Sequence, residues 1–320
     1  MKILITGAAG FIGFSFSKFL LEKTNHEIIG IDNLNNYYSP EIKKKRLKVL
    51  KKFKNFKFIK LDIKNKKKVD LIFKKKINAV FHFAAQAGVR YSLKHPRTYI
   101  ENNIAGFYNI LENSVNHKVT KMFYASSSSV YGDSKKFPNK EDDNTDKPLS
   151  FYAASKKSNE VMAYSYSNIY KIPITALRFF TVYGPMGRPD MSLFKFTKSI
   201  INSKKIDLYN YGIHERDFTY IEDVTISINK LLKKPSKMKI PYNCFNIGSN
   251  RPKKLNYFIQ LIEKNLNFKA KKNFLPMQLG DVYKTHADNK KLNKYINFKP
   301  KVSIDSGIKN FIKWFLNYYK

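Results

Sequence analysis

The chain has 320 residues, of which 43% are hydrophobic and 15% aromatic; this excludes an intrinsically disordered chain and allows a full core in one large domain or two joined ones. A single cysteine, Cys244, excludes an intrachain disulfide and is typical of a reducing compartment. The net charge of +36 raises the question of nucleic-acid binding, but lysine runs such as "EIKKKRLKVLKKFKN" are amphipathic, so we expect solvated faces and no specific nucleic-acid partner.

The first segment, "MKILITGAAG", has an apolar run that stops at Gly7 and is shorter than the apolar region of a signal peptide. No apolar run approaches the ~20 residues that a membrane helix needs. We therefore expect a cytoplasmic protein that has no membrane partner.

Seven apolar, β-branched segments are predicted strands, at residues 2–7, 27–32, 56–62, 79–85, 121–128, 174–180 and 242–248. Segments of helical length, 11–24 and 98–116, lie between the early strands. This alternation favours an α/β fold with a Rossmann-type, doubly wound parallel sheet. After Arg178 several prolines interrupt the pattern, which indicates a smaller C-terminal substrate-binding portion.

A glycine-rich turn, "ITGAAGFIG", follows the first predicted strand and opens a predicted helix. Gly7, Gly10 and Gly13 would let the backbone turn tightly and approach a pyrophosphate at the helix N-terminus. The second strand ends at Asp32, where a carboxylate would bind the adenosine ribose of NAD and repel the 2′-phosphate of NADP. Asp62, which ends the third strand, is a candidate for the adenine end. A plain turn residue is the alternative for both acids.

Serines 126–129 end the fifth predicted strand, and Tyr152 and Lys156 follow on the next predicted helix, 152–169. Four-residue spacing places the last two on one helix face. A tyrosine titrates near pH ~10, and a neighbouring ammonium lowers that pKa. Serine, tyrosine and lysine together form a proton-transfer set, in which the tyrosinate takes a hydroxyl proton. In a chain with 21 tyrosines, a chance Tyr-x-x-x-Lys is the alternative.

These motifs, with "RFFTVYGP" and "RDFTYIEDV", resemble the extended short-chain dehydrogenase/reductase family over essentially all 320 residues. Within that family, "NLNNYY", "AAQAGVRYS", "YASSSSVYG", "FTVYGPMGRPDM" and "LPMQLGDV" resemble the UDP-glucuronate 4-epimerases. The resemblance implies an NAD-binding domain over residues 1–178 with a return at 217–250, and a UDP-sugar-binding portion at 179–216 and 251–320. It also implies a homodimer formed through residues 98–116 and 152–169.

The resemblance assigns roles to individual residues. It implies that Ser127, Tyr152 and Lys156 are catalytic, with Tyr152 as the base. The cofactor contacts that it implies are Gly7, Gly10, Phe11, Ile12, Gly13, Asp32, Asn33, Asp62, Ile63, Phe83, Ala84, Ala85, Asn102, Tyr152 and Lys156. The substrate contacts that it implies are Arg90 at the sugar, Ser127, Ser129, Thr181 and Arg188 near the sugar carboxylate, Arg216 at the diphosphate, and Asp281 at the uridine ribose.

Some of these positions have plainer readings or depart from the family pattern. The alternative for Arg188 is a loop salt bridge. Gln278 stands where related glucose epimerases have an arginine, which puts one phosphate contact in doubt. His82 lies within a buried strand pattern and is expected to be a satisfied core residue.

The implied reaction begins when Tyr152 removes the proton of the sugar 4-hydroxyl and NAD takes hydride from C4. The 4-ketone then turns over and receives the hydride on its other face, with no metal required. The nearest alternatives are a UDP-glucuronate decarboxylase, which forms UDP-xylose, and a UDP-glucose or UDP-N-acetylglucosamine 4-epimerase. Dehydration is disfavoured because Ser128 and Ser129 stand where dehydratases carry Asp-Glu. A non-catalytic, RNA-binding Rossmann protein is the alternative from another class.

Overall fold

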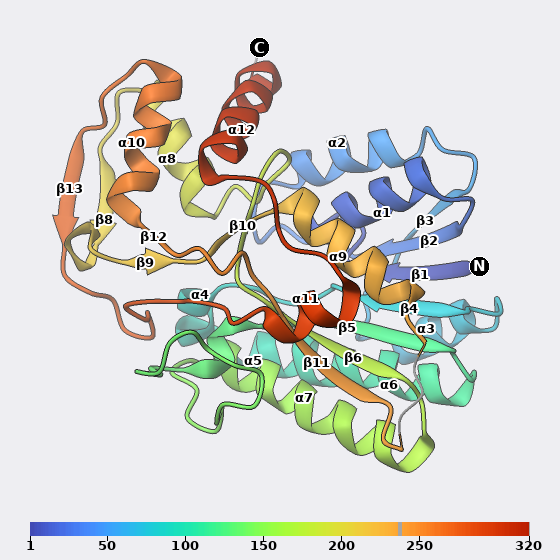
Figure 1. The fold of residues 1–320 in the computed structure, drawn as a ribbon. Coiled ribbons are helices and arrows are strands. Elements are labelled where there is room, and N and C mark those ends of the chain that lie inside the picture. Colours follow the sequence, from blue (N-terminus) through green and yellow to red (C-terminus); the bar gives the residue numbers. More distant parts are fainter. Residues whose placement is uncertain (236–238, 320) are drawn as a thin grey trace.

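A seven-stranded parallel sheet runs through the centre of the computed structural model, which describes residues 1–235 and 239–319 (Figure 1). Its strands are β1 (Lys2–Thr6), β2 (Glu27–Asp32), β3 (Phe56–Lys60), β4 (Ala79–His82), β5 (Lys121–Ser127), β6 (Ile174–Phe179) and β11 (Tyr242–Ile247). Every predicted strand segment contributes one of them, and the predicted doubly wound sheet is confirmed. The strand order is β11-β6-β5-β4-β1-β2-β3. The strands β2 and β3 therefore lie on one side of β1, and the later strands, from β4 on, lie on its other side. Open α/β sheets bind ligands at the carboxyl ends of the strands at such a switch point.

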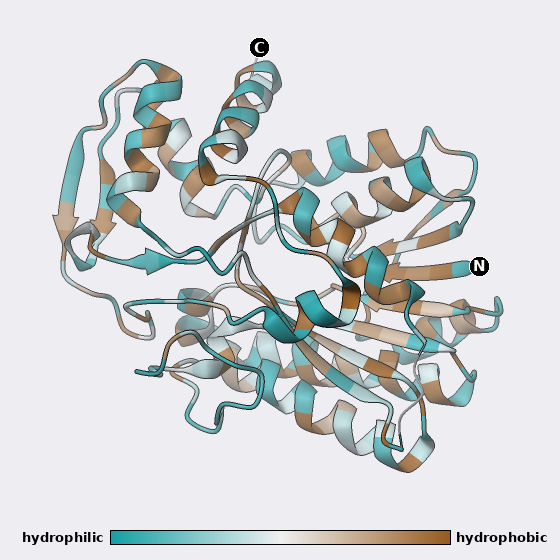
Figure 2. Ribbon diagram, in the orientation of Figure 1, coloured by the Kyte–Doolittle hydropathy of each residue, from teal (hydrophilic) through white to brown (hydrophobic). Residues whose placement is uncertain are grey.

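Helices cover both faces of this sheet. One face carries α1 (Phe11–Lys23), α2 (Pro40–Leu50) and α9 (Ile221–Lys233); the other carries α3 (Lys66–Phe73), α6 (Gly106–Asn116) and α7 (Phe151–Tyr170). Phe16 and Val224 are buried in the first layer, and Phe73 and Phe107 in the second. Hydrophobic residues accordingly concentrate on the strands and on the inner helix faces (Figure 2).

The C-terminal portion has its own apolar core, built by α8 (Ser192–Ile201), α10 (Leu255–Leu266) and α12 (Ile304–Tyr319). The rings of Phe218 and Phe258 stack there with centroids 4.2 Å apart. Three two-stranded sheets support it: β7 (Thr181–Tyr183) with β10 (Phe218–Tyr220), β8 (Ile206–Tyr209) with β13 (Lys272–Leu275), and β9 (Glu215–Arg216) with β12 (Lys253–Lys254). This portion lies beside the carboxyl ends of the large sheet (Figure 1).

The segment 98–116, expected to be one helix, is built from three pieces. They are the end of α5 (Pro96–Tyr99), a π-helical stretch η1 (Ile100–Ala105) and α6. Such π-stretches are often found at functional sites. The remaining elements are α4 (Val89–Lys94), the 3₁₀ turns η2 (Ser128–Tyr131) and η3 (Asn210–Gly212), and α11 (Lys290–Ile296). Within residues 1–235 and 239–319, no helix combines the length and the apolarity needed to cross a bilayer.

Candidate active site

A cavity of about 1130 Å³ opens at the carboxyl ends of the central strands, between the sheet and the C-terminal portion. It exceeds the ~300–1,000 Å³ of a typical ligand pocket, so it has room for more than one small ligand. The cavity wall contains these residues singled out from the sequence: Gly7, Gly10, Phe11, Ile12, Gly13, Asp32, Asn33, Ile63, Phe83, Ala84, Ala85, Arg90, Asn102, Ser127, Ser129, Tyr152, Lys156, Thr181, Arg188, Arg216 and Asp281. Asp62 is not in this wall; its carboxylate accepts hydrogen bonds from the Asn33 side chain at 3.2 Å and the Lys64 backbone at 2.9 Å.

The turn between β1 and α1 requires glycine at two positions. Gly7 has φ +70°, and a Cβ added there would lie 2.7 Å from the backbone nitrogen of Ala84. A Cβ on Gly13 would lie 2.2 Å from the carbonyl oxygen of Gly7. The turn brings the start of α1 to the cavity wall, where the first backbone N–H groups have no partner within the helix. This end of the cavity is therefore suited to a phosphate group.

Asp32 ends β2 and is 8% exposed. Its carboxylate accepts hydrogen bonds from the backbone nitrogens of Ala9 at 3.2 Å and Leu34 at 2.8 Å. The Nζ of Lys43 on α2 lies 3.7 Å from the carboxylate. Burial lowers the pKa of Lys43, and Asp32 acts against that effect. Lys43 belongs to a lysine run that was expected to lie on a solvated face. For this residue that expectation is wrong: its side chain is buried, and its Nζ donates to the backbone carbonyl of Asn35 at 3.1 Å and to the Asn35 side chain at 2.9 Å.

Ser127, Tyr152 and Lys156 meet where β5 ends and α7 begins. The Ser127 hydroxyl accepts a hydrogen bond from the backbone of Ser129 at 3.1 Å and donates to its hydroxyl at 3.2 Å. Ser150 starts α7 by accepting a hydrogen bond from the backbone of Ala153 at 3.1 Å. The resulting helix presents Tyr152 and Lys156 to the same cavity, as their spacing predicted.

The two titratable groups of this set have shifted pKa values. Burial raises the pKa of Tyr152, while the Ser127 hydroxyl and the Arg188 guanidinium act in the opposite direction. Burial lowers the pKa of Lys156 to about 8, and its ammonium donates to the carbonyl of Ala125 at 2.8 Å. The groups that favour the Tyr152 phenolate in this structure are therefore Ser127 and Arg188, whereas Lys156 is directed toward a strand carbonyl.

His82 lies behind this set in β4 and is 1% exposed. Its Nδ1 is 2.8 Å from the hydroxyl of Thr6. Burial and the charge of Lys156 lower its pKa to about 3, so the ring is neutral. The expectation of a satisfied core histidine is confirmed.

The depressed pKa of Lys156 predicts a pH-dependent stability. Between about pH 8 and pH 10.5, the ordinary value, the unfolded chain keeps a proton on this lysine that the folded chain has lost. The free energy of unfolding, relative to that of a Lys156→Met variant, should therefore rise with pH across this window, by at most about 3 kcal/mol. Denaturant unfolding of both cofactor-free proteins at several pH values measures the difference. Parallel profiles would contradict the assignment of this pKa.

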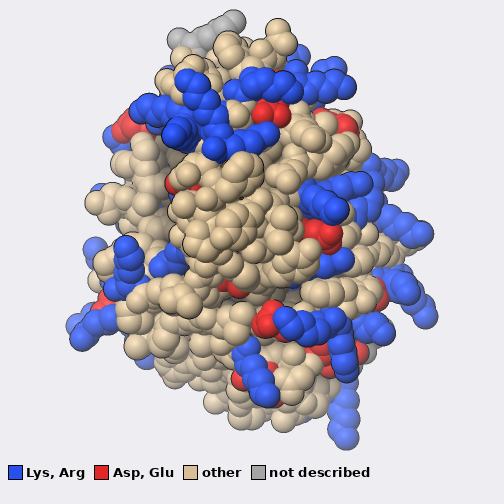
Figure 3. All heavy atoms as spheres, turned by 90° about the vertical axis from the view of Figure 1, so that its left-hand side faces the viewer, with Lys and Arg blue, Asp and Glu red and all other residues tan. Residues whose placement is uncertain are grey.

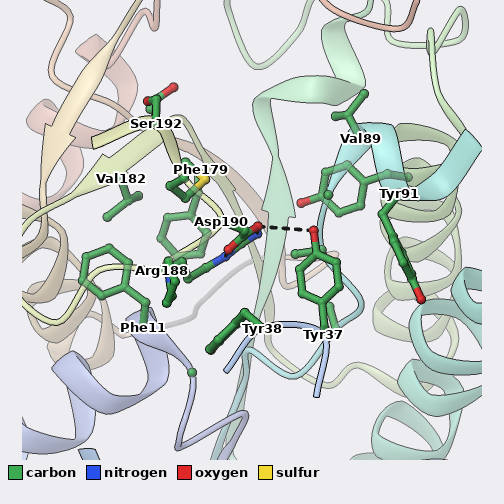
Figure 4. Close-up of a pocket in the computed structure, with 18 of the residues that line it drawn as sticks. Phe11, Tyr37, Tyr38, Val89, Tyr91, Phe179, Val182, Arg188, Asp190 and Ser192 are labelled. Carbon is green, nitrogen blue, oxygen red and sulfur yellow. Dashed lines mark hydrogen bonds and ion pairs between the residues drawn. The ribbon is translucent and has the colours of Figure 1, made fainter. Parts of the chain in front are cut away.

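Arg188 is paired with a resident acid that the sequence did not single out. Its Nε donates to Asp190 at 3.0 Å, its Nη2 donates to the second oxygen, and the Tyr37 hydroxyl donates to Asp190 at 3.2 Å. Figure 4 shows Arg188 and Asp190 side by side between Tyr37 and Phe11. Burial acts to raise the pKa of Asp190, but Arg188 holds it below its ordinary value. The salt bridge considered for Arg188 therefore exists, and it engages the Nε–Nη2 edge of a guanidinium that still lines the cavity.

Arg216 lies in β9 at another part of the cavity wall. It donates to the backbone carbonyls of Glu215 and Tyr283, each at 2.9 Å, and no ion pair joins it to a carboxylate within residues 1–235 and 239–319. Burial lowers its pKa to about 10. Arg90 pairs with Asp281 at 2.9 Å, so these two predicted ligand contacts touch each other in this structure. A cation without a resident anion in a cavity is suited to an anionic ligand.

His214 lies near Arg216, and the backbone carbonyl of Gln278 accepts a hydrogen bond from the backbone of Asp281 at 3.2 Å. His214 lines the cavity, and its Nδ1 lies 3.4 Å from the Arg216 guanidinium. It lacks a motif signal in the sequence. Gln278, the departure from the family pattern, has a buried Oε1 without a hydrogen-bond partner in the described structure.

Comparison with known proteins places this geometry in a family. Residues 3–248 match the model of the NAD dependent epimerase/dehydratase family. Protein CapI of Staphylococcus aureus is 48% identical over 100% of both chains, and a UDP-glucuronate 4-epimerase of Thermodesulfobacterium geofontis is 42% identical over 97% of this chain and 95% of its own. The crystal structure of UDP-glucuronic acid 4-epimerase from Bacillus cereus, in complex with UDP-glucuronic acid and NAD, covers 100% of both chains with a TM-score of 0.94 and 34% identity. The chain therefore belongs to the NAD-dependent epimerase/dehydratase family, as its motifs predicted.

Proposed function

We propose that this protein is an NAD-dependent UDP-glucuronate 4-epimerase, which interconverts UDP-glucuronate and UDP-galacturonate through a 4-keto sugar. The observation that carries the proposal is that one cavity holds Ser127, Tyr152 and Lys156 together with the glycine turn and Arg188. The similarity to the T. geofontis and B. cereus 4-epimerases supports it.

In the proposed function, NAD binds at one end of the cavity. The glycine turn, the start of α1 and Asp32 would hold NAD, with Asn33, Asp62, Ile63, residues 83–85 and Asn102 around it. The chemistry that bound NAD supplies is reversible hydride transfer at C4 of the sugar. Residues 1–178 and 217–250 would form this cofactor domain, and residues 179–216 and 251–320 the UDP-sugar portion.

The residues of the chain supply binding and proton transfer. Tyr152 takes the proton of the 4-hydroxyl and returns it to the product, while Ser127 hydrogen-bonds the same oxygen. Arg216 binds the diphosphate and Asp281, released from Arg90, binds the uridine ribose. Thr181 and the free edge of Arg188 bind the sugar carboxylate, with Ser129 and Arg90 near the sugar.

The carboxylate contact decides between epimerase and decarboxylase. The 4-keto sugar is a β-keto acid, so a loosely held carboxylate is lost as carbon dioxide. A bidentate guanidinium restrains the carboxylate against that loss. Purified protein should be incubated with UDP-glucuronate, UDP-glucose and UDP-N-acetylglucosamine, and the products identified by NMR. UDP-galacturonate as the main product supports the proposal, whereas UDP-xylose or an exclusive action on the neutral sugars contradicts it.

The basic surface is the observation behind the RNA-binding alternative. Lys and Arg outnumber Asp and Glu on the face in Figure 3 and are spread over its upper, lateral and lower parts. Non-specific RNA binding that depends on such charge weakens steeply with salt. NAD that copurifies with the protein, and turnover at moderate salt, favour the enzyme; salt-resistant binding to one RNA without turnover favours the alternative.

The proposal predicts a preference for NAD over NADP. Asp32 lies where it would bind the ribose hydroxyls, and its charge opposes a 2′-phosphate. Asp32→Ala is expected to weaken NAD retention by roughly 10- to 150-fold, the loss of one charge-assisted hydrogen bond. Equilibrium dialysis with both dinucleotides measures this. Equal affinity of the wild type for NADP and NAD would contradict the role proposed for Asp32.

The proposal includes a homodimer formed through the segments 98–116 and 152–169. On α7, Val161, Tyr164 and Ile169 are 58%, 48% and 62% exposed, and Tyr108 on α6 is 36% exposed. Burying such side chains between subunits would stabilise association by ~1.5–3 kcal/mol each. Val161→Glu should therefore shift the light-scattering mass toward one chain. Leu71→Glu, at a 57% exposed site on α3, is the matched control and should leave the mass unchanged. A monomeric wild type contradicts this part of the proposal.

We also infer a cytoplasmic location, from the single cysteine.

A further inference from the structure

Arg46 on α2 is a fully buried cation that does not line the cavity. It forms no ion pair with a carboxylate in the described parts of the chain, 1–235 and 239–319. It stands in the same basic run as Lys43, among lysines that were expected to lie on a solvated face. A buried guanidinium is costly to retain unless its N–H groups are well bonded, so its partners indicate what it does.

The backbone carbonyls that Arg46 binds lie in two segments that serve different ligands. Its Nη1 donates to the carbonyl of Ala9 at 2.8 Å, inside the glycine turn. Its Nη1 also donates to the hydroxyl of Tyr38 at 3.0 Å, and its Nε has no hydrogen-bond partner in the described structure. Its Nη2 donates to the carbonyls of Met186 at 2.6 Å and Gly187 at 3.2 Å, directly before Arg188. One rigid fork of N–H donors thus joins the cofactor turn to the loop that carries Arg188.

That loop is a turn with an unfavourable backbone conformation. The backbone nitrogen of Gly187 donates to the carbonyl of Gly184 at 3.0 Å, and Met186 between them has φ +58°. Residues other than glycine and asparagine rarely adopt this left-handed backbone conformation. The turn therefore needs stabilising contacts from other segments of the chain. The hydrogen bonds from Arg46 to Met186 and Gly187 supply such support.

We propose that Arg46 is a positioning residue for sugar recognition. It fastens the 184–187 turn onto the glycine turn and thereby fixes where Arg188 presents its free edge to the sugar. Its loss should lower the preference for a sugar that carries a carboxylate, without altering the binding of UDP itself. The inference rests on the proposed function, because it requires Arg188 to contact that carboxylate.

The test measures binding of UDP, UDP-glucose and UDP-glucuronate by calorimetry in a Tyr152→Phe background, which prevents turnover. Arg46→Lys keeps the buried charge, but an ammonium cannot bridge both segments as a fork does. We expect the preference for UDP-glucuronate over UDP-glucose to fall about tenfold, the scale of one charge-assisted hydrogen bond. UDP affinity should stay within about twofold. Lys48→Met, an exposed cation on the same helix, is the matched control and should change neither quantity.

Two further variants separate the possible outcomes. If Arg46→Lys does not fold, Arg46→Gln, whose amide can still donate to one segment, is measured in its place with the same expectation. Arg188→Ala should remove the preference, and adding Arg46→Lys to it should cause no further loss. Arg188→Ala without effect overturns the carboxylate assignment and this inference together. Loss of preference in Arg188→Ala but not in Arg46→Lys, or an equal loss of UDP affinity in Arg46→Lys, overturns this inference alone.

Discussion

Tyr152→Phe is expected to lower kcat by ~10²–10⁴, the usual scale for a lost general acid–base group. Tyr152 shares the cavity with Ser127 and Arg188, which both favour its phenolate. Phenylalanine keeps the ring, and hence the packing against Tyr99 at a centroid distance of 6.1 Å, so the loss isolates the hydroxyl.

The measurement is single-turnover product formation by NMR, with the affinity for UDP-glucuronate determined in parallel. An affinity close to that of the wild type, with slow turnover, assigns the effect to chemistry. The matched control is Tyr131→Phe, which should retain most of kcat. Tyr131 is a buried tyrosine near β6, and its hydroxyl donates a hydrogen bond to the Asn246 side chain at 2.6 Å. Near-normal turnover of Tyr152→Phe would mean that the Tyr-x-x-x-Lys spacing is a coincidence.

Arg188→Ala is expected to lower kcat/KM for UDP-glucuronate by roughly 10- to 150-fold, because a charge-assisted contact is worth ~1.5–3 kcal/mol. Any activity on UDP-glucose should fall far less, since that sugar has no carboxylate. Arg188→Lys should restore only part of the loss, because an ammonium cannot present two parallel N–H donors. Product analysis should also show more UDP-xylose from the alanine variant.

The pair with Asp190 requires a control in this experiment. Alanine at position 188 leaves a carboxylate without its partner in the cavity wall, which lowers stability whatever the ligand. The double variant Arg188→Ala, Asp190→Asn removes that unpaired charge and should show the same loss on UDP-glucuronate. Equal losses on both sugars would mean that Arg188 holds the loop and does not bind the carboxylate.

The sequence predicted the central sheet well because parallel strands that are buried on both faces form nearly continuous apolar runs. It did not resolve the short strands of the C-terminal portion, such as Lys253–Lys254, because two residues show no period. It also read 98–116 as one regular helix, since a change from α- to π-helical bonding within a helix leaves the apolar spacing almost unchanged.

The residues of the site likewise fall into those that the sequence revealed and those that it did not. Gly7, Tyr152 and Lys156 are visible because their roles depend on neighbours within a turn or two of the chain. Lys43 was misread as solvated and Arg46 was not singled out, because their partners are close only in the folded chain. These partners are Asp32 for Lys43 and the carbonyls of Ala9 and Met186 for Arg46. The pairing of Asp190 with Arg188 is local, yet charges two residues apart pair only when the loop turns, which a spacing does not reveal.

The most direct test of the proposed mechanism follows the hydrogen at C4. The protein should be incubated with UDP-glucuronate that carries deuterium at C4, in ordinary water and without added cofactor, and the product examined by NMR. The proposed mechanism predicts UDP-galacturonate that keeps the deuterium at C4, because the hydride removed is the one returned. UDP-galacturonate with hydrogen from solvent at C4, or UDP-xylose as the main product, would contradict it.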